Sequence, residues 1–486
     1  MRKFFGFILL LFHVSLGLTQ SYSEQYAFYI NSEDLEKHIR VLASDSFQGR
    51  ETGYEGQAMT TDYLIQQLRR DNMKGPTGFE NMRFPFKVVE VKPSGSIRLN
   101  DKEYSYFDDF VFFNTKETFV QRDEEVIFIS GNISDNDISE INLAGKLILL
   151  NAGEKEFDYE ELLNETEKFM DKGATAVIYC TPFYDKLKIY FNEFAHHSSM
   201  YLKTDTLKNI TPLIIGREEI LNKSGLKKKW KRKLDKGKKI TKIISLSPGD
   251  ISLNTDTTHL ETENVVAFIE GKELKDEVVV ITAHMDHLGA EDGEIYNGAD
   301  DNATGTAALL EIAQAFSLAK KDGHQMKRSL LIMPVSGEEK GLLGSRFYSE
   351  NPIFPLSLTL ANLNIDMIGR NDEFHDSSNY VYVIGSNMIS DELHDINEEA
   401  NRKYVGIDLD YTYNSFDDPN RYYFRSDHYN FAKHGIPSIF YFSGVHEDYH
   451  KPSDTVDKIN FEKVETVTRL VFFTAWELLN HQGGLK

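Results

Sequence analysis

Residues 278–305 read VVVITAHMDHLGAEDGEIYNGADDNATG. The β-branched beginning of this stretch predicts a buried strand, which ends where His284 and Asp286 appear. A polar loop follows, and the GADDN segment after it leads into a predicted helix over residues 304–320. A strand, an acidic loop and a helix form one α/β unit, and sheets built from such units carry their chemistry at the carboxyl ends of the strands. The stretch therefore predicts an α/β domain with functional residues after this strand.

The carboxylates of Asp300 and Asp301 have two possible roles on this evidence. Aspartate often caps a helix, and a negative charge near the helix N-terminus is favoured by the helix dipole. A histidine and several carboxylates at a strand end are also typical of a metal site. The choice depends on what the other strand ends carry.

The same alternation of strands and helices continues from residue 264 to the end of the chain. The β-branched or aromatic pattern of strands occurs at residues 264–269, 278–283, 328–335, 358–365, 380–384 and 437–442. Helical spacing occurs at residues 304–320, 341–350, 390–404, 428–434 and 461–480. Such alternation predicts a three-layer α/β/α fold, in which helices cover both faces of a mostly parallel or mixed sheet.

Acidic or imidazole side chains follow three further predicted strands. Glu338 and Glu339 follow the third strand, Asp366 follows the fourth, and His446 and His450 follow the last. A buried strand end rarely carries unpaired carboxylates, because an uncompensated buried charge is costly. A divalent metal shared among these residues would neutralise that charge. Histidines with several carboxylates and no thiolate favour zinc, and two neighbouring metals would need a bridging carboxylate.

The composition limits the alternatives. A chain of 486 residues with 41% hydrophobic residues is long enough for two folded units with sizeable cores. The formal net charge of -22 argues against nucleic acid as the main partner. The single cysteine, Cys180, excludes an internal disulfide framework and a zinc site made of thiolates.

Met1–Gln20 has the pattern of a secretory signal peptide. Arg2 and Lys3 precede an apolar run over Phe4–Leu18, and polar residues follow. The run is short for a membrane span, although an uncleaved anchor stays an alternative. No later stretch is apolar enough to cross a bilayer. We therefore expect a secreted or periplasmic protein with no integral membrane segment after cleavage of the signal.

The predicted domain organisation has an insert within the α/β domain. We assign residues 1–20 to the signal peptide, 21–95 to the first part of the α/β domain, 96–255 to the insert and 256–486 to the rest of that domain. Helices are predicted over residues 32–42 and 56–70, and strands over residues 84–99 and 102–113. The insert is predicted to be small and β-rich, with a helix over residues 159–172. It contains His196 and His197, which we expect to be surface or inter-domain residues. Its basic run, Lys227–Lys239, is expected to be a solvated face, and an electrostatic tether to a polyanion is the alternative.

The motifs AHMDH, NGADDNATG, SGEE, NIDMIG, SDHYNFAKHGIP and YHKPSDT, in this order, resemble the co-catalytic di-zinc aminopeptidases of peptidase family M28. Each motif alone is weak, whereas all six in this order are specific. The resemblance covers residues 264–480 and extends to FQGRETG near the N-terminus, which looks like the lead-in of the family. The segments AGKLILLNAGE and KGATAVIY are similar to the protease-associated (PA) domain that is often inserted in this family.

The resemblance implies two zinc ions per chain and a role for each motif residue. His284 and Asp366 match the outer ligands of one zinc, and Glu339 and His450 match those of the other. Asp301 matches the bridging carboxylate, after which the family often has a cis peptide bond.

The resemblance also implies three catalytic residues. Glu338 matches the general base, and Asp286 matches the residue that orients the His284 imidazole. Tyr449 matches a tyrosine that polarises the substrate carbonyl in some members.

These roles predict a metallo-exopeptidase that acts on peptides or proteins with a free N-terminus. A water activated by two zinc ions would attack the scissile carbonyl, and Glu338 would transfer its proton to the leaving amine. Glutaminyl cyclisation or carboxypeptidase action on a related fold stays an alternative, as does a binding role without catalysis. The complete ligand set argues against the last of these.

Several other residues near the motifs are expected to have no direct role. His287 and His446 are expected to lie behind the ligands or at the surface. The adjacent Ser426, Asp427 and His428 cannot form a catalytic triad with mutual hydrogen bonds. The aromatic-rich loop over residues 411–424 is expected to form a pocket wall or a packing surface.

Overall fold

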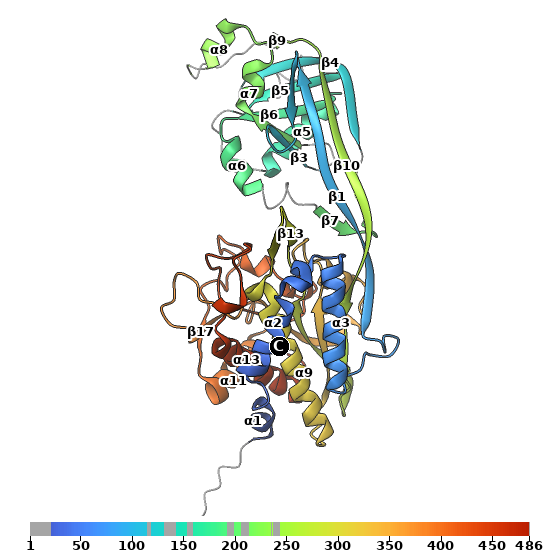
Figure 1. Cartoon of the computed structure of the whole chain (residues 1–486), viewed down its shortest axis with the longest axis vertical. Helices are drawn as coiled ribbons and strands as arrows, with labels where there is room; N and C mark the ends of the chain where they lie inside the picture. Colours follow the sequence, from blue (N-terminus) through green and yellow to red (C-terminus); the bar gives the residue numbers. More distant parts are fainter. Residues whose placement is uncertain are drawn as a thin grey trace, which may run out of the picture. The chain divides into compact units, whose positions relative to one another are not determined.

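The computed structural model describes residues 21–113, 118–130, 142–152, 159–191, 199–205, 213–234, 236 and 244–485 (Figure 1). The chain forms two compact units, one made of Met1–Pro85 with Thr262–Lys486 and the other of Phe86–Glu261. The sequence placed these boundaries at residues 96 and 255. The difference lies within two long strands, β1 (Arg83–Leu99) and β10 (Gly249–Val265), each of which belongs partly to both units. Both strands run through the boundary without a break, so the strand pattern in the sequence does not reveal it.

The first unit contains a seven-stranded mixed sheet in the order β11-β15-β12-β16-β19-β17-β18. Its four central strands, β15, β12, β16 and β19, are parallel, whereas β11 and β17 are antiparallel to their neighbours in this group. The strand bounds are β11 (Ala267–Ile269), β12 (Leu274–His284), β15 (Arg328–Val335), β16 (Thr359–Ile365), β17 (Tyr380–Ile384), β18 (Asp408–Asp410) and β19 (Ser438–Phe442). The prediction of a mixed α/β sheet is confirmed.

Helices cover both faces of this sheet, as the alternation of side chains along β12 shows. Val279 and Ile281 pack in a core with α9 and α13, while Val278 and Val280 pack in a second core with α10 and α12. Because successive strand residues point to opposite faces, both faces must be buried. The helices are α1 (Tyr22–Ala27), α2 (Ser32–Leu42), α3 (Glu55–Arg70), α9 (Gly305–Lys321), α10 (Leu343–Glu350), α11 (Asp391–Ala400), α12 (His428–Ala432) and α13 (Phe461–Asn480).

Short helical turns and a hairpin complete the first unit. The turns are η1 (Asp45–Arg50), η3 (Ala299–Thr304), η4 (Leu356–Leu358), η5 (Asn401–Val405), η6 (Tyr422–Phe424) and η7 (Val456–Lys458). The hairpin pairs β13 (Gly289–Glu291) with β14 (Glu294–Tyr296). In the described residues, no helix has the length and apolar character needed to cross a membrane.

The second unit is β-rich, as predicted, and its central strands β4, β5, β6 and β8 pair in parallel. Its strands other than β1 and β10 are β2 (Lys102–Ser105), β3 (Phe110–Phe113), β4 (Phe119–Ser130), β5 (Lys146–Asn151), β6 (Ala176–Thr181), β7 (Ser199–Leu202), β8 (Leu213–Arg217) and β9 (Ile244–Ser245). Its helices are α5 (Tyr159–Asp171), α6 (Tyr184–Phe191), α7 (Glu218–Lys223) and α8 (Lys228–Leu234). Helix α8 contains part of the basic run, whereas His196, His197 and the signal segment lie outside the described residues.

Two predicted strands are interrupted in the structure. The strand expected over residues 264–269 is split at Val266 into β10 and β11. The backbone N–H of Val266 donates to the carbonyl of Met82, so the hydrogen-bond ladder of the sheet does not continue through this residue. The strand expected between Lys102 and Phe113 is split into β2 and β3 by a turn, in which Phe107 has a φ of 65°. Val266 is itself hydrophobic, so the apolar pattern continues through the first interruption, whereas Asp108 and Asp109 in the second are a turn signal that the prediction passed over.

One buried histidine makes the stability of the first unit depend on pH. The ring of His428, at the start of α12, is fully buried and stacks on Phe440 with 4.9 Å between the ring centroids. Burial lowers the pKa of His428 to about 3. Below the unfolded value of about 6.5, the unfolded chain therefore gains a proton that the folded chain does not. Above about pH 6.5 the buried His428 therefore costs no stability, and below it the free energy of unfolding decreases progressively as the pH falls toward 3.

His428→Phe is expected to reduce the loss of stability between pH 7.5 and pH 5 by about 2 kcal/mol, since each pH unit below 6.5 contributes about 1.4 kcal/mol. Urea unfolding of the wild type and the variant at the two pH values measures this difference. His434→Phe, at an exposed histidine six residues later, is the control and should keep the wild-type dependence. Equal slopes for wild type and His428→Phe would contradict the prediction.

Candidate metal centre and active site

The site lies where the carboxyl ends of the four parallel strands meet. His284 is the last residue of β12, Asp366 directly follows β16, and Glu339 and His450 lie in the loops after β15 and β19. Because these strands are neighbours in the sheet, their ends bring the four side chains together. Asp301 comes from η3, the turn that leads into α9.

The Asp301 carboxylate lies between two pairs of side chains. Its Oδ1 atom is 3.3 Å from His284 Nε2, which is also 3.2 Å from Asp366 Oδ1. Its Oδ2 atom is 3.2 Å from His450 Nε2, which is also 3.2 Å from Glu339 Oε2. Each oxygen of Asp301 thus faces one histidine–carboxylate pair, which is the arrangement that a bridging carboxylate requires.

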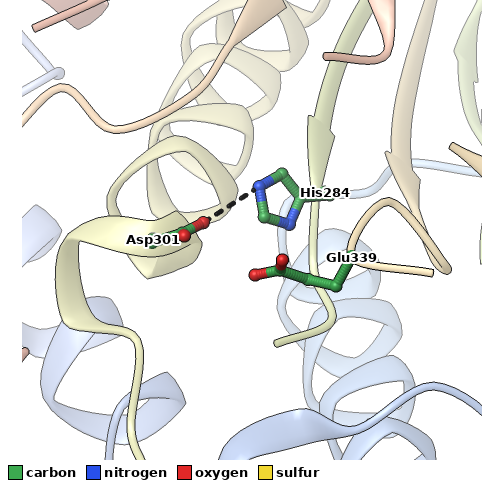
Figure 2. A group of neighbouring side chains, drawn as sticks. All are labelled: His284, Asp301 and Glu339. Carbon is green, nitrogen blue, oxygen red and sulfur yellow. Dashed lines mark ion pairs between the residues drawn. The ribbon is translucent and has the colours of Figure 1, made fainter. Parts of the chain in front are cut away.

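The spacing of these atoms fits zinc. With zinc–ligand bonds of about 2.0–2.2 Å, tetrahedral geometry separates neighbouring ligand atoms by about 3.3–3.5 Å. The four separations of 3.2–3.3 Å are close to this value and longer than a typical charge-assisted hydrogen bond of about 2.7–2.9 Å. His450 Nε2 is also buried with no hydrogen-bond partner, although carboxylates surround it. Figure 2 shows three of these side chains, His284, Asp301 and Glu339, directed at a common point, and their ligand atoms lie within 4.8 Å of one another.

The capping interpretation of the aspartates does not describe this structure. Helix α9 has no side-chain cap, and Asp301 faces the imidazoles of His284 and His450. Burial acts to raise the pKa of Asp301, but the two imidazoles outweigh it and hold that pKa well below the usual range. The carboxylate is therefore ionised. The peptide bond between Asp301 and Asn302 is cis, as the resemblance implied.

Asp286 lies behind His284, but its carboxylate does not make the expected contact with the imidazole. His284 Nδ1 is 3.2 Å from the backbone carbonyl oxygen of Asp286 and 3.9 Å from its Oδ1 atom. The Asp286 carboxylate instead accepts hydrogen bonds from the Thr52 hydroxyl, at 2.7 Å, and from the backbone N–H of Glu338, at 3.3 Å. Asp286 therefore links the N-terminal segment to the loop that carries Glu338.

Thr52→Val is expected to reduce zinc affinity or activity by about 10- to 100-fold, the usual effect of removing a contact behind a metal ligand. The hydroxyl of Thr52 is the donor that fixes the buried Asp286 carboxylate, and valine keeps its shape without that donor. Zinc competition with a chromogenic chelator measures the affinity. Thr258→Val, at an exposed position of the second unit, is the control. Unchanged affinity and activity would show that Asp286 needs no such donor.

Glu338 and Glu339 differ in proton affinity although they are adjacent. Burial, with the charges of Glu339 and Asp366, raises the pKa of Glu338 well above its usual range. Burial also acts to raise the pKa of Glu339, but His450 and His287 outweigh it and lower that pKa to about 2. Glu339 is thus suited to hold a metal and Glu338 to accept a proton.

The two histidines expected behind the ligands or at the surface are both buried. His287 Nδ1 is 2.7 Å from Glu339 Oε1, which is a hydrogen-bond distance and holds one oxygen of that ligand. His446 Nε2 is 3.3 Å from Asp300 Oδ2, so it contacts the turn next to the bridging carboxylate. Both residues therefore lie directly behind the ligands and not at the surface.

The sequence reading missed several residues that position the ligands. Ser426, treated as part of a misleading triad, donates to Asp366 Oδ2 at 2.7 Å. Asp454 accepts from the backbone N–H groups of Asp300 and Asp301 and so fixes the bridging turn. Both residues lie within the quoted motifs, which was the one indication in the sequence that they have a role. Their contacts could not be predicted, because polar contacts between distant segments leave no periodic pattern.

Arg50, in the N-terminal FQGRETG segment, is the largest of these missed residues. Its guanidinium is buried and donates to the backbone carbonyls of Met285 at 3.0 Å, Asn297 at 2.6 Å and Gly298 at 2.9 Å. These carbonyls lie in the loops before and after the hairpin, so one side chain links the loop of His284 to the turn of Asp301. Burial lowers the pKa of Arg50 to about 10, which leaves it charged.

A cavity opens at the ligands. Its charged end is formed by His284, Asp301, Glu338, Glu339 and Asp366. Its remaining wall is formed by Met367, Tyr422, Arg425, Phe440, Phe442, Val445 and Tyr449. Of the aromatic loop expected as a pocket wall, Tyr422 lines the cavity, and the exposed Phe416 does not. Burial and the nearby Asp301 and Glu339 raise the pKa of Tyr449 well above its usual range, so its phenol keeps a proton to donate.

Comparison with known proteins agrees with this geometry. Residues 264–475 match the model of peptidase family M28. A probable leucine aminopeptidase of Arthroderma otae is 31% identical over 222 residues, which are 44% of this chain and 57% of that relative. The chain thus spans little more than half the length of this relative.

Solved structures share the fold over nearly the whole chain. An aminopeptidase from Aneurinibacillus sp. strain AM-1 superposes with a TM-score of 0.61 at 18% identity, covering 96% of this chain and 97% of that one. A zinc aminopeptidase from Bacillus subtilis superposes with a TM-score of 0.55 at 17% identity, covering 93% and 96%. At these identities the likeness establishes the fold.

Proposed function

Residues 264–475 of this chain belong to peptidase family M28, and on that premise we propose that the protein is a zinc-dependent aminopeptidase with two metal ions per chain. The observation that carries the proposal is the Asp301 carboxylate, whose two oxygens face two separate histidine–carboxylate pairs at 3.2–3.3 Å. A single metal would leave one of these pairs without a role. The named relatives, a probable leucine aminopeptidase and a zinc aminopeptidase, support the same interpretation.

The residues divide into two metal positions. His284, Asp366 and Asp301 would hold one zinc, and His450, Glu339 and Asp301 the other. Zinc at these positions supplies Lewis acidity to a water molecule and to the substrate carbonyl.

Glu338 moves the proton in the proposed mechanism. Its carboxylate lines the cavity beside the ligands but belongs to neither histidine–carboxylate pair. From this position it accepts the proton of the attacking water and then donates it to the leaving amine. Its buried surroundings, which disfavour a negative charge on the carboxylate, assist the first transfer.

Tyr449 stabilises the oxyanion that develops on the substrate carbonyl. Its phenol lines the same cavity and retains its proton. One such donor typically contributes about 3–4 kcal/mol of transition-state stabilisation. A zinc together with acidic groups at the charged end of the cavity would hold a free α-amine, which favours attack on the first peptide bond of a chain.

The test is zinc content measured together with hydrolysis of a panel of aminoacyl-anilides. We expect about two zinc ions per chain, and activity on free but not N-acetylated substrates. Two zinc ions with no aminopeptidase activity would redirect the assay to glutaminyl cyclase and carboxypeptidase substrates. A purified protein that binds no zinc would refute the proposal.

We also propose that the second unit is a protease-associated domain and that Met1–Gln20 directs export. The first rests on the motif similarity at residues 144–154 and 172–179 and on the β-rich fold of the unit. The second rests on the composition of the segment alone. N-terminal sequencing of protein recovered outside the cytoplasm should begin near residue 21, whereas an intact Met1 in cytosolic protein would contradict export.

A further inference from the structure

Arg425 places a positive charge in an otherwise acidic cavity. It lies between η6 and α12, its side chain is exposed, and it lines the cavity that also contains Glu338 and Asp366. Two aromatic side chains hold it in position. The guanidinium lies over the Tyr422 ring, 5.2 Å from its centroid, and Nη2 donates to the Tyr449 hydroxyl at 3.4 Å.

Within the described part of the chain, no carboxylate lies within ion-pair distance of Arg425. By contrast, Arg370 in the same unit pairs with Asp448 at 3.1 Å. Three of the four cavity carboxylates already have other partners, because Asp366 accepts from Ser426, and Asp301 and Glu339 face imidazoles. A guanidinium has five N–H donors in a rigid fork suited to a carboxylate, and most of those on Arg425 are unused.

The position of Arg425 indicates which part of a substrate it can reach. In the proposed mechanism the Tyr449 phenol contacts the oxyanion of the scissile carbonyl, and Arg425 contacts that same phenol oxygen. It therefore lies about one residue from the scissile carbonyl, since successive residues are about 3.8 Å apart. In a dipeptide, the group one residue beyond the scissile carbonyl is the C-terminal carboxylate.

We propose that Arg425 is a carboxylate-binding subsite on the leaving-group side, which makes dipeptides with a free C-terminus preferred substrates. The inference rests on the proposed aminopeptidase function and extends it to a substrate class. Tyr422 limits the motion of the guanidinium, so little freedom is lost when the carboxylate binds.

The test compares leucyl-alanine with leucyl-alanine amide, which differ only in the terminal charge. For the zinc-loaded wild type we expect kcat/KM for the acid to exceed that for the amide by about 10- to 100-fold, the range of a charge-assisted pair. Arg425→Met should bring the ratio close to one, and Arg425→Lys should restore part of it. Any effect of Arg425 that acts through Tyr449 changes kcat/KM equally for both substrates and therefore cancels in their ratio.

Arg421→Met is the matched control. Arg421 is also exposed and stacks on an aromatic ring, that of Phe424 at 5.1 Å, but it does not line the cavity. This variant should keep the wild-type ratio. A wild-type ratio near one, or a ratio that Arg425→Met leaves unchanged, would overturn the proposal.

A second pair of substrates identifies the source of the carboxylate. If Arg425 reads an acidic N-terminal side chain instead, glutamyl-anilide will be favoured over glutaminyl-anilide and Arg425→Met will abolish that preference, which also overturns the proposal. Activity on leucyl-anilide in each protein shows separately that the aminopeptidase assignment holds. If no substrate is cleaved, calorimetric binding of the acid and the amide to the same variants decides the subsite independently of turnover.

Discussion

Glu338→Gln is expected to lower kcat by about 10²- to 10⁴-fold, the usual contribution of a positioned general base. Glutamine has nearly the same shape as glutamate but cannot accept the proton of the attacking water. Zinc content should stay near the wild-type value, because neither histidine–carboxylate pair around Asp301 includes Glu338. Steady-state hydrolysis of leucyl-anilide and metal analysis of the same sample measure the two quantities.

The control for this variant is Glu350→Gln, which changes a surface glutamate at the end of α10 that pairs with Arg346. It should retain wild-type activity. A Glu338→Gln enzyme with more than about a tenth of wild-type kcat would assign the proton transfer to another group. A loss of zinc in step with the loss of activity would mean that Glu338 is a ligand.

Asp301→Ala is expected to weaken the binding of both zinc ions by more than about 100-fold, exceeding the effect of removing a contact behind a single ligand. The reason is geometric, since one oxygen of Asp301 faces each histidine–carboxylate pair. Removing it leaves each metal with only two side-chain ligands. A calorimetric titration of the apo-protein with zinc should show that both binding steps are weakened together.

His450→Ala and Asp292→Asn separate this effect from general damage. His450 belongs to only one of the two histidine–carboxylate pairs, so its removal should weaken one zinc-binding step much more than the other. Asp292 is exposed in the turn of the β13–β14 hairpin, and its variant should bind zinc as the wild type does. Retention of one tight zinc site in Asp301→Ala would contradict the bridging role.

The sequence was sufficient for the elements whose signal is local. The strands over Arg328–Val335 and Tyr380–Ile384 and the helices over Ser32–Leu42 and Phe461–Asn480 were predicted with the bounds that the structure has. Each is a long or strongly patterned segment, whose side chains repeat at the period of its structure.

The sequence also indicated the ligand-type residues, because side chains that follow strands of one parallel sheet must meet at one edge. His284, Asp301, Glu339, Asp366 and His450 were named on that basis and on the order of their motifs, and the structure brings them together.

Only the tertiary structure revealed the contacts that hold these residues in place. Arg50 donates to carbonyls more than two hundred residues away, and Thr52 reaches Asp286 over a similar separation. It also showed that the imidazole of His284 contacts the backbone carbonyl of Asp286 more closely than its carboxylate. Such contacts depend on where loops pass in space, and a loop has no repeating pattern from which its path could be read. The positions of the strands along the chain and the chemistry at their ends follow from local pattern, whereas the positioning of each ligand depends on long-range packing.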